Sequence, residues 1–297
     1  MLDIEILQPD TIEEALRLLE ERGEDAKIIA GGTAVVLMMK GGLIAPSALI
    51  SLGRIQGMNS IREESGVGVR IGALATLREC EISPRLRAAN TTLARTFGTV
   101  ANVRVRNAAT VGGNLAEADY ASDPPTTFLA MRATVTARSV RGERQIPIAE
   151  FFKDFYETAL EPGEIVTEVL VPELSASTHS AYLKYVSRSS EDRPCIGVAA
   201  VVELMADGRC QDLRVAVGAV AAIPQQVEAG ESLARGQHLT DELVAEIAET
   251  YSANIEPLDD LRGSKWYRKQ MIRVFVRRAI ETALSDSDLS NREGTPA

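Results

Sequence analysis

Two short segments of the chain pair two glycines with small polar side chains, a combination that can bind an anion. They read AGGTAVV at residues 30–36 and TVGGNLAEADYASD at residues 110–123. Neither matches the G-x-G-x-x-G dinucleotide pattern or the phosphate loop that ends in Gly-Lys-Ser or Gly-Lys-Thr. Glycine lacks a Cβ atom and tolerates positive φ, so backbone N–H groups can come close to a phosphate. We therefore expect two similar tight turns that bind a pyrophosphate.

Polar side chains within these segments extend the same chemistry. Thr33 and Thr110 offer hydroxyl donors, Asn114 offers an amide, and Asp123 offers a carboxylate that could accept from a ribose hydroxyl. Neither glycine pair has a Lys or Arg beside it, which favours recognition by backbone amides over recognition by a point charge. Taken singly, each glycine pair could equally form an ordinary turn. Taken together, they favour a dinucleotide held between two lobes.

Composition excludes several other functions. The chain has 297 residues, which predicts two or three domains, and a net charge of −10, which argues against nucleic acid as a partner. Its three cysteines, Cys80, Cys195 and Cys210, show no C-x-x-C spacing, and only two histidines accompany them. A metal or iron–sulfur site within the chain is therefore not expected. Any redox chemistry must come from a bound cofactor or a partner chain.

The apolar runs are too short to span a membrane, and the N-terminus, MLDIEILQPD, lacks the basic start of a signal peptide. We therefore expect a cytoplasmic protein without a membrane span.

The first glycine segment is expected to lie between a strand and a helix. A strand over 2–7 precedes a helix with Thr11 as N-cap, Glu14 completing a capping box and Gly23 ending it. A short strand over 27–30 then leads into the glycine pair, and a short helix over 34–39 follows.

The second glycine segment follows a capping residue at Thr76 and a helix predicted over 85–101. Strands are expected over 134–138 and 165–171, and a linker follows Pro172. The remainder predicts three strands, with a hairpin turn at Asp207-Gly208, and helices near 225–235, 240–252 and 264–284. The fold class is α+β in three lobes.

Six segments, in chain order, resemble the FAD-binding medium subunits of the molybdenum hydroxylases, such as carbon monoxide dehydrogenase, xanthine dehydrogenase and 4-hydroxybenzoyl-CoA reductase. The resemblance reaches from the first residues to about Leu284. The segments are IAGGTAVVLMMK, IGALAT, VRNAATVGGNLAEADYASDPP, LEPGEIVTEVLVP, YLKYVSRSSEDRPCIGVAAVV and DDLRGSKWYRKQMIRVFVRRA.

This resemblance implies a two-lobed FAD-binding domain of the vanillyl-alcohol-oxidase-like (PCMH) type. Its lobes would cover residues 1–57 and 58–174. A smaller C-terminal α+β domain with a three-stranded antiparallel sheet would cover 178–285. Beyond it, the polar composition of residues 286–297 predicts a disordered tail.

The resemblance also assigns FAD-binding residues by matching motifs, and it implies no catalytic side chain and no metal ligand. Both glycine segments would surround the pyrophosphate, Ser122 and Asp123 would lie near the ribose and adenine, and Val166 and Lys184 would approach the flavin ring. A cation such as Lys184 near the ring would favour the anionic reduced flavin. The residues of the two glycine segments are Ile29, Ala30, Gly31, Gly32, Thr33, Ala34, Val35, Val36, Thr110, Val111, Gly112, Gly113 and Asn114.

Two departures from the family pattern stand out. Many relatives carry an acidic or amide side chain where this chain has Ala34, so we expect a lower FAD affinity from the lost contact. The scattered cysteines also exclude the extra iron–sulfur cluster that 4-hydroxybenzoyl-CoA reductase carries in this subunit.

The implied function is electron transfer. A large subunit would carry the molybdenum cofactor, a small subunit would carry two 2Fe-2S clusters, and the FAD of this chain would pass electrons to a quinone, NAD or oxygen. The assembly would be a dimer of heterotrimers. Two alternatives are a docking subunit that has lost its flavin, for which Ala34 is the support, and a free-standing FAD oxidoreductase. The chain does not indicate the substrate.

A group of arginines is unusual in this acidic chain. It could face the iron–sulfur subunit or the adenine half of FAD, but a solvated helix face with local ion pairs is favoured. Its members are Arg85, Arg87, Arg95, Arg104 and Arg106.

Overall fold

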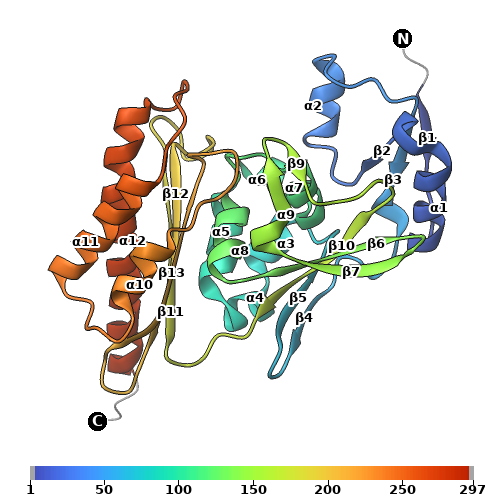
Figure 1. Cartoon of the computed structure of the whole chain (residues 1–297). Helices are drawn as coiled ribbons and strands as arrows, with labels where there is room; N and C mark the ends of the chain where they lie inside the picture. Colours follow the sequence, from blue (N-terminus) through green and yellow to red (C-terminus); the bar gives the residue numbers. More distant parts are fainter. Residues whose placement is uncertain (1–3, 294–297) are drawn as a thin grey trace. The chain divides into compact units, whose positions relative to one another are not determined.

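The computed structural model describes the backbone of residues 4–293 and the side chains of residues 4–285. The chain forms two compact units, each built from segments that are discontinuous in sequence (Figure 1). Unit 1 holds residues 4–89, 101–119 and 133–172, and unit 2 holds residues 90–100, 120–132 and 173–293.

Unit 1 begins with a small parallel sheet in the order β1 (Glu5–Leu7), β3 (Ala48–Ser51) and β2 (Ala26–Ile29). Helix α1 (Ile12–Arg22) packs against this sheet through Ala15 and Leu16. Half of the predicted capping box is present, because the Thr11 side chain accepts a 3.2 Å hydrogen bond from the Glu14 N–H. The Glu14 carboxylate accepts from the Asp10 N–H at 3.0 Å instead of the Thr11 N–H, and Gly23 ends the helix with φ +53°. A 3-10 turn (Gly23–Asp25) leads from α1 into β2, which ends at the first glycine segment, and α2 (Val35–Lys40) follows.

The larger sheet of unit 1 has five strands, and all of its neighbours are antiparallel. Loop residues after β3 include a 3-10 turn (Leu52–Arg54), and the chain then enters the sheet. The strand order is β4 (Ile61–Glu64), β5 (Gly68–Gly72), β10 (Ile165–Pro172), β6 (Thr134–Ser139) and β7 (Gly142–Pro147).

Short helices and one hairpin complete unit 1. Thr76 caps α3 (Leu77–Ile82) in a full capping box with Glu79, as the sequence predicted. The other elements are α4 (Pro84–Ala89), α6 (Val103–Arg106), α7 (Val111–Glu117), α9 (Ile148–Phe151) and the two-stranded hairpin of β8 (Phe152–Asp154) and β9 (Glu157–Thr158).

The predicted single helix over 85–101 is wrong. The chain breaks it at Asn90, whose side chain accepts a 2.9 Å hydrogen bond from the Leu93 N–H and so starts a new helix, α5 (Thr91–Thr99). Asparagine favours this capping conformation over a helix interior because its side chain competes for backbone hydrogen bonds. The two helices then belong to different units.

Unit 2 is built on the three-stranded antiparallel sheet that the sequence predicted, with β11 (Thr178–Tyr185), β12 (Ile196–Leu204) and β13 (Cys210–Gly218). One face carries α10 (Glu228–Ala234), α11 (Asp241–Asn254) and α12 (Lys265–Glu293), and the other face carries α5 and α8 (Asp123–Ala130) (Figure 1). Central strand β12 is therefore apolar on both faces, from Ile196 to Val202.

The end of the chain differs from the predicted disordered tail over 286–297. Helix α12 runs on to Glu293, because the first strong helix breaker after residue 285 is Gly294. Residues 294–297 lie outside the described part of the chain.

Candidate functional site

A cavity of about 740 Å³ lies within unit 1 and is lined by both glycine segments. Its volume lies within the range of about 300–1,000 Å³ that is typical of small-molecule and cofactor sites. Eleven of the residues that the family resemblance assigned to FAD line it. They are Ala30, Gly31, Gly32, Thr33, Ala34, Val35, Thr110, Gly112, Gly113, Asn114 and Val166.

The first glycine segment presents a run of hydrogen-bond donors to this cavity. Gly32 has φ +70°, a left-handed conformation that favours glycine and turns the chain between β2 and α2. Within the described part of the chain, the N–H groups from Gly31 to Ala34 donate to no other group. Four consecutive residues with such amides line one cavity, and a run of amides of this kind is the donor set that a phosphate or pyrophosphate needs.

Gly31 has a different role from Gly32, because it brings the two glycine segments together. A Cβ atom built on Gly31 would lie 1.8 Å from the carbonyl oxygen of Ala108 and 3.0 Å from the Ala109 nitrogen. The backbone before the second segment thus passes directly over the first. Only glycine fits this contact.

The second glycine segment is not a turn, so the expectation of two similar turns is wrong. Gly112 and Gly113 lie in the first turn of helix α7. The Thr110 side chain caps that helix by accepting a 3.1 Å hydrogen bond from the Gly113 N–H. The Val111 and Gly112 amides donate to Ala75 and Ala73. These amides already have acceptors within the protein, and the Thr110 hydroxyl acts as an acceptor here.

Gly112 is required for packing. A Cβ atom at this position would lie 2.6 Å from the Ala73 Cβ and 3.0 Å from the Ala73 oxygen. At Gly113, a Cβ atom would meet only the Thr110 hydroxyl, at 2.9 Å. The helix therefore lies tightly on the turn after β5, and its small side chains leave the cavity open beside it.

Three residues of the glycine segments are absent from the described lining of the cavity. Ile29 and Val36 flank Gly32 through their side chains, and Val111 is buried in the core at 1% exposure. They support the site through packing.

The remaining predicted residues, Ser122, Asp123 and Lys184, belong to unit 2. Asp123 and Lys184 form a buried ion pair at 3.0 Å, and the Lys184 ammonium also donates to the Thr99 carbonyl at 2.8 Å. Tyr182 donates to the other Asp123 oxygen at 2.5 Å. Burial and the Asp123 charge together raise the pKa of Tyr182 well above its ordinary value. The Lys184 charge is therefore balanced by a carboxylate.

Sequence reasoning missed several parts of the cavity wall. Tyr156 and the chain from Leu160 to Ile165 line it, as do Lys27, Ala73 and Leu74. The segments IGALAT and LEPGEIVTEV contain most of these residues and carried the family resemblance, but no feature of either segment indicated a ligand contact. Tyr156 lay outside every segment that the sequence singled out.

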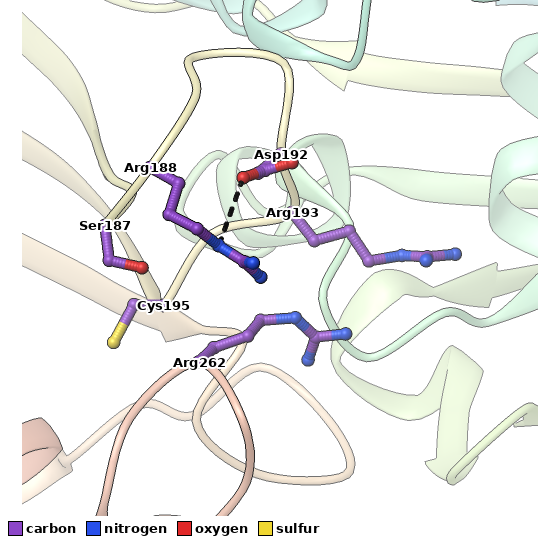
Figure 2. A pocket seen from close by; sticks show the side chains of 6 residues that line it. All are labelled: Ser187, Arg188, Asp192, Arg193, Cys195 and Arg262. Carbon is purple, nitrogen blue, oxygen red and sulfur yellow. Dashed lines mark ion pairs between the residues drawn. The ribbon is translucent and has the colours of Figure 1, made fainter.

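A smaller cavity of about 170 Å³ lies in unit 2 between the β11–β12 loop and the loop that contains Arg262. Figure 2 shows three guanidinium groups, of Arg188, Arg193 and Arg262, against the single carboxylate of Asp192. The Arg188–Asp192 ion pair spans 4.0 Å. This composition suits a small anion, and the lining contains no residue that the resemblance assigned to FAD.

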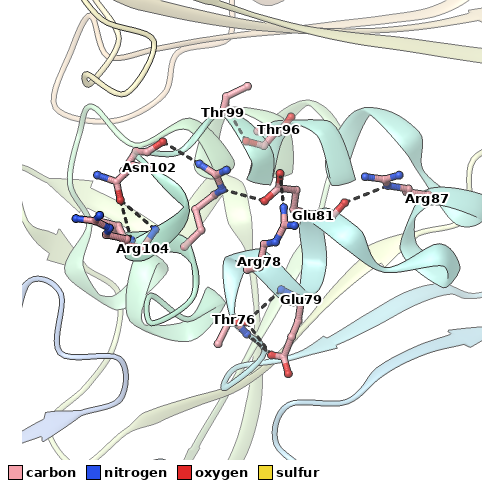
Figure 3. A network of polar contacts seen from close by, with 12 residues as sticks. Thr76, Arg78, Glu79, Glu81, Arg87, Thr96, Thr99, Asn102 and Arg104 are labelled. Atoms are coloured by element: carbon pink, nitrogen blue, oxygen red, sulfur yellow. Dashed lines mark hydrogen bonds and ion pairs between the residues drawn. The ribbon is translucent and has the colours of Figure 1, made fainter.

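Of the arginine group, Arg106 forms a local ion pair, whereas Arg85 and Arg87 donate to the backbone carbonyls of Ile61 and Glu81. Figure 3 shows the contacts around Glu81. Arg106 pairs with Glu81 at 2.9 Å and donates to the Ala101 carbonyl at 2.8 Å, and Arg78 pairs with the same Glu81 at 3.0 Å. Burial raises the pKa of Glu81, but hydrogen bonds from Arg78 and Arg106 outweigh it, so the pKa lies below its ordinary value. These arginines organise the segment before α7.

Among the described residues, no group of three or more His, Cys, Asp or Glu side chains could hold a metal ion, and all three cysteines are buried. In the same part of the chain, the helices lack any apolar stretch of membrane-spanning length.

Comparisons with protein families cover almost the whole chain. A family described as the FAD binding domain in molybdopterin dehydrogenase matches residues 2–174. A second family, the CO dehydrogenase flavoprotein C-terminal domain, matches residues 181–283.

Individual relatives agree with these families. The carbon monoxide dehydrogenase medium chain of Hydrogenophaga pseudoflava is 34% identical over 275 residues, which cover 93% of this chain and 95% of that one. The 6-hydroxypseudooxynicotine dehydrogenase complex subunit alpha of Paenarthrobacter nicotinovorans is 34% identical over 275 residues, covering 93% of this chain and 92% of that one.

Solved structures show the same fold. A chain of carbon monoxide dehydrogenase from Hydrogenophaga pseudoflava, in a form that lacks the Mo-pyranopterin moiety, superposes with a TM-score of 0.91 at 34% identity, covering 95% of this chain and 97% of that one. A chain of quinoline 2-oxidoreductase from Pseudomonas putida 86 gives 0.90 at 28% identity, with coverages of 95% and 97%. The expected mixed helix and sheet fold is thereby confirmed.

Proposed function

Because this chain belongs to the FAD-binding subunits of molybdenum-containing dehydrogenases, we propose that it acts as the electron-transfer flavin subunit of a molybdenum hydroxylase complex. Its relatives are subunits of oxidoreductase complexes that include carbon monoxide and xanthine dehydrogenases. The oxidoreductase assignment follows directly from this membership.

The observation that carries the proposal is the run of amide donors from Gly31 to Ala34 on the wall of the 740 Å³ cavity. We propose that these four N–H groups bind the FAD pyrophosphate, with the Thr33 hydroxyl as a further donor. Ala34 contributes its N–H alone, so the contact that an acidic or amide side chain would make in many relatives is lost. The donor set and the cavity volume both fit a dinucleotide.

The second glycine segment supports the pyrophosphate in a different way. Thr110, Gly112 and Gly113 fix helix α7 against the turn after β5, and their small size lets a ligand approach the helix. The Asn114 side chain, which also lines the cavity, is the polar group of this segment that we assign to FAD. The residues that flank the segments, Ile29, Val36 and Val111, contribute through packing.

For the flavin ring and the adenine half, the proposal keeps the residues that the resemblance assigned. Val166 supplies an apolar wall of the cavity, and Ser122, Asp123 and Lys184 keep the roles that the resemblance gives them. Since Lys184 and Asp123 form a buried pair, Lys184 acts as one half of a neutral pair, so its effect on the reduced flavin is smaller than that of an isolated cation.

The proposed assembly contains two further chains. Relatives are named as medium chains or subunits, which supports a complex with other subunits. We propose a large molybdenum-cofactor subunit, a small subunit with two 2Fe-2S clusters, and a dimer of such heterotrimers. Bound FAD would supply the redox chemistry that links the iron–sulfur clusters to an external acceptor such as a quinone, NAD or oxygen.

The domain organisation that accompanies this proposal is the two-lobed vanillyl-alcohol-oxidase-like domain, with lobes over 1–57 and 58–174, followed by a domain over 178–285. The two matched families, over 2–174 and 181–283, support a boundary between residues 174 and 181.

An FAD titration of the full-length chain tests the function. We expect saturable binding that survives desalting, and its loss in the double variant Gly32→Val, Gly113→Val. Valine at φ +70° disfavours the turn that carries the amides, and valine at position 113 crowds the Thr110 hydroxyl that caps α7. Gly42→Val is the matched control, since Gly42 shares φ +70° with Gly32 but has open space around it. A folded chain that takes up no FAD, even with partner chains present, would instead support the flavin-free docking subunit. A chain that binds FAD but copurifies with neither molybdenum nor iron would support the free-standing oxidoreductase.

A further inference from the structure

Tyr156 occupies the turn of the β8–β9 hairpin in a conformation that tyrosine rarely adopts. Its φ is +57°, in the left-handed region, and its side chain is 52% exposed. For an L-residue with a bulky side chain, this conformation is unfavourable relative to the right-handed one, whereas glycine avoids most of that cost. A hairpin turn alone would favour glycine, asparagine or aspartate here.

A second left-handed residue holds Tyr156 in place. The Tyr156 N–H donates a 3.2 Å hydrogen bond to the carbonyl of Ala118, which itself has φ +50° and ends helix α7. Ala118 is buried, at 2% exposure. The surrounding structure therefore fixes the hairpin turn to the end of the helix that carries the second glycine segment. Such strain persists only where packing determines the conformation, and it clusters at ligand sites.

The position of Tyr156 points to a ligand. Of the five non-glycine residues with positive φ in the described part of the chain, Tyr156 is the one that lines the 740 Å³ cavity. The amide donors from Gly31 to Ala34 line the same cavity. An aromatic residue and a pyrophosphate-type donor set on one cavity match a dinucleotide, whose pyrophosphate has a planar heteroaromatic ring system at each end.

We propose that Tyr156 is a contact residue for FAD, with its phenol ring stacked on one of the two heteroaromatic rings of the dinucleotide. This inference rests on the proposed function. The strained backbone presents the ring to the cavity, and the ring rather than the hydroxyl makes the contact. Stacking on an aromatic side chain is a sequence-tolerant and favourable contact for any nucleobase-like ring.

The test measures FAD affinity and stability together, in Tyr156→Gly, Tyr156→Asn and Tyr156→Phe. Glycine and asparagine both accept the left-handed backbone, so neither variant should lower the thermal midpoint, and glycine should raise it. Both should raise the FAD dissociation constant by about 5- to 150-fold, the range that removal of base stacking gives. Tyr156→Phe should bind within about twofold of the wild type, because it keeps the ring.

Phe155→Ala is the matched control. Phe155 is the neighbouring aromatic residue of the same turn, is 42% exposed and is absent from the described lining of the cavity. Its replacement should leave the FAD dissociation constant unchanged.

The outcomes separate this inference from the function on which it depends. If the folded wild-type chain bound no FAD, the proposed function would fail. If the wild type bound FAD and the glycine and asparagine variants bound it equally well, the stacking role alone would be overturned. Titrations with FMN and with ADP then identify the ring. A selective loss of FMN binding in Tyr156→Gly assigns the isoalloxazine, and a selective loss of ADP binding assigns the adenine.

Discussion

At the scale of single residues, Gly31 and Gly32 are required for different physical reasons, and their variants should differ. Gly31→Ala places a Cβ atom 1.8 Å from a backbone oxygen, so we expect a loss of at least about 3 kcal/mol in the free energy of unfolding. Gly32→Ala meets only flexible side chains at 3.3 and 3.4 Å and should lose about 1–2 kcal/mol from its positive φ. Urea denaturation of both variants measures the difference.

Gly42→Ala serves as the reference for positive φ alone, because it shares φ +70° and has no atom within 4 Å of the added Cβ. It should lose about as much as Gly32→Ala. Equal losses for Gly31→Ala and Gly42→Ala would contradict the close approach of the two glycine segments.

Glu164, in the cavity wall, should make the stability of the folded protein depend on pH. Its side chain, 5% exposed, accepts bonds of 2.7 and 2.8 Å from Arg144, and the Glu161 N–H also donates to it. The Arg144 hydrogen bonds hold the pKa of Glu164 below its ordinary value, with burial opposing them. A lowered folded pKa means that this stabilisation is complete above the unfolded carboxyl pKa, about 4.3, and is lost as the pH falls through the folded pKa.

We therefore expect the stability gap between the wild type and Glu164→Gln to be constant near neutral pH and to shrink below about pH 4. Denaturant unfolding at pH 7, 5 and 3.5 measures it. A gap of the same size at every pH would show that Glu164 titrates normally in the folded protein.

At the scale of elements, Thr110 links the capping of helix α7 to the candidate site. Thr110→Ala removes the acceptor of the Gly113 N–H, so we expect a loss of about 0.5–2 kcal/mol in stability together with weaker FAD binding. Thr110→Ser should restore both. Thr240→Ala is the control, because Thr240 caps α11 of unit 2 in the same way and should reduce stability while leaving FAD affinity unchanged. Equal FAD affinities for the two alanine variants would contradict a role of α7 at the site.

The elements that sequence predicted well are those with local signals. Helix α1 has its cap and its terminating glycine, and the sheet of unit 2 has runs of apolar residues and an Asp-Gly turn. The sequence predicts a turn at the second glycine pair because glycine lacks a Cβ atom and tolerates positive φ. The structure places it in a helix because Gly112 must pass close to Ala73, a contact between residues far apart in sequence that no local pattern reveals.

The difference between local signals and long-range contacts also explains which parts of the site were predicted. The donor run of the first glycine segment follows from its own sequence, and both segments do line one cavity. The wall formed by Tyr156 and Glu164 comes from segments without a ligand signature. The pairing of Lys184 with Asp123 also depends on tertiary packing, so the expectation of an isolated cation did not anticipate it.

At the scale of the whole molecule, the sequence boundary near residue 174 does not coincide with the packing of the chain. Helix α8, whose residues Asp123–Ala130 are all buried, packs against β12 and β13 of unit 2. A fragment of residues 1–174 would leave that apolar helix without its sheet, so we expect it to bind a hydrophobic dye and to aggregate. Light scattering and dye fluorescence measure this. A monomeric fragment with cooperative unfolding and no dye binding would contradict the packing of α8 on unit 2.

The central claim is that this chain carries FAD within a molybdenum-containing complex. The most direct test is the visible absorption spectrum, with metal analysis, of the affinity-tagged full-length chain purified together with the chains that accompany it. The account predicts flavin absorption that survives desalting, about one FAD per chain, and molybdenum and iron in the same fractions. A folded chain that is colourless in the flavin region, both alone and with its partner chains, would contradict the account.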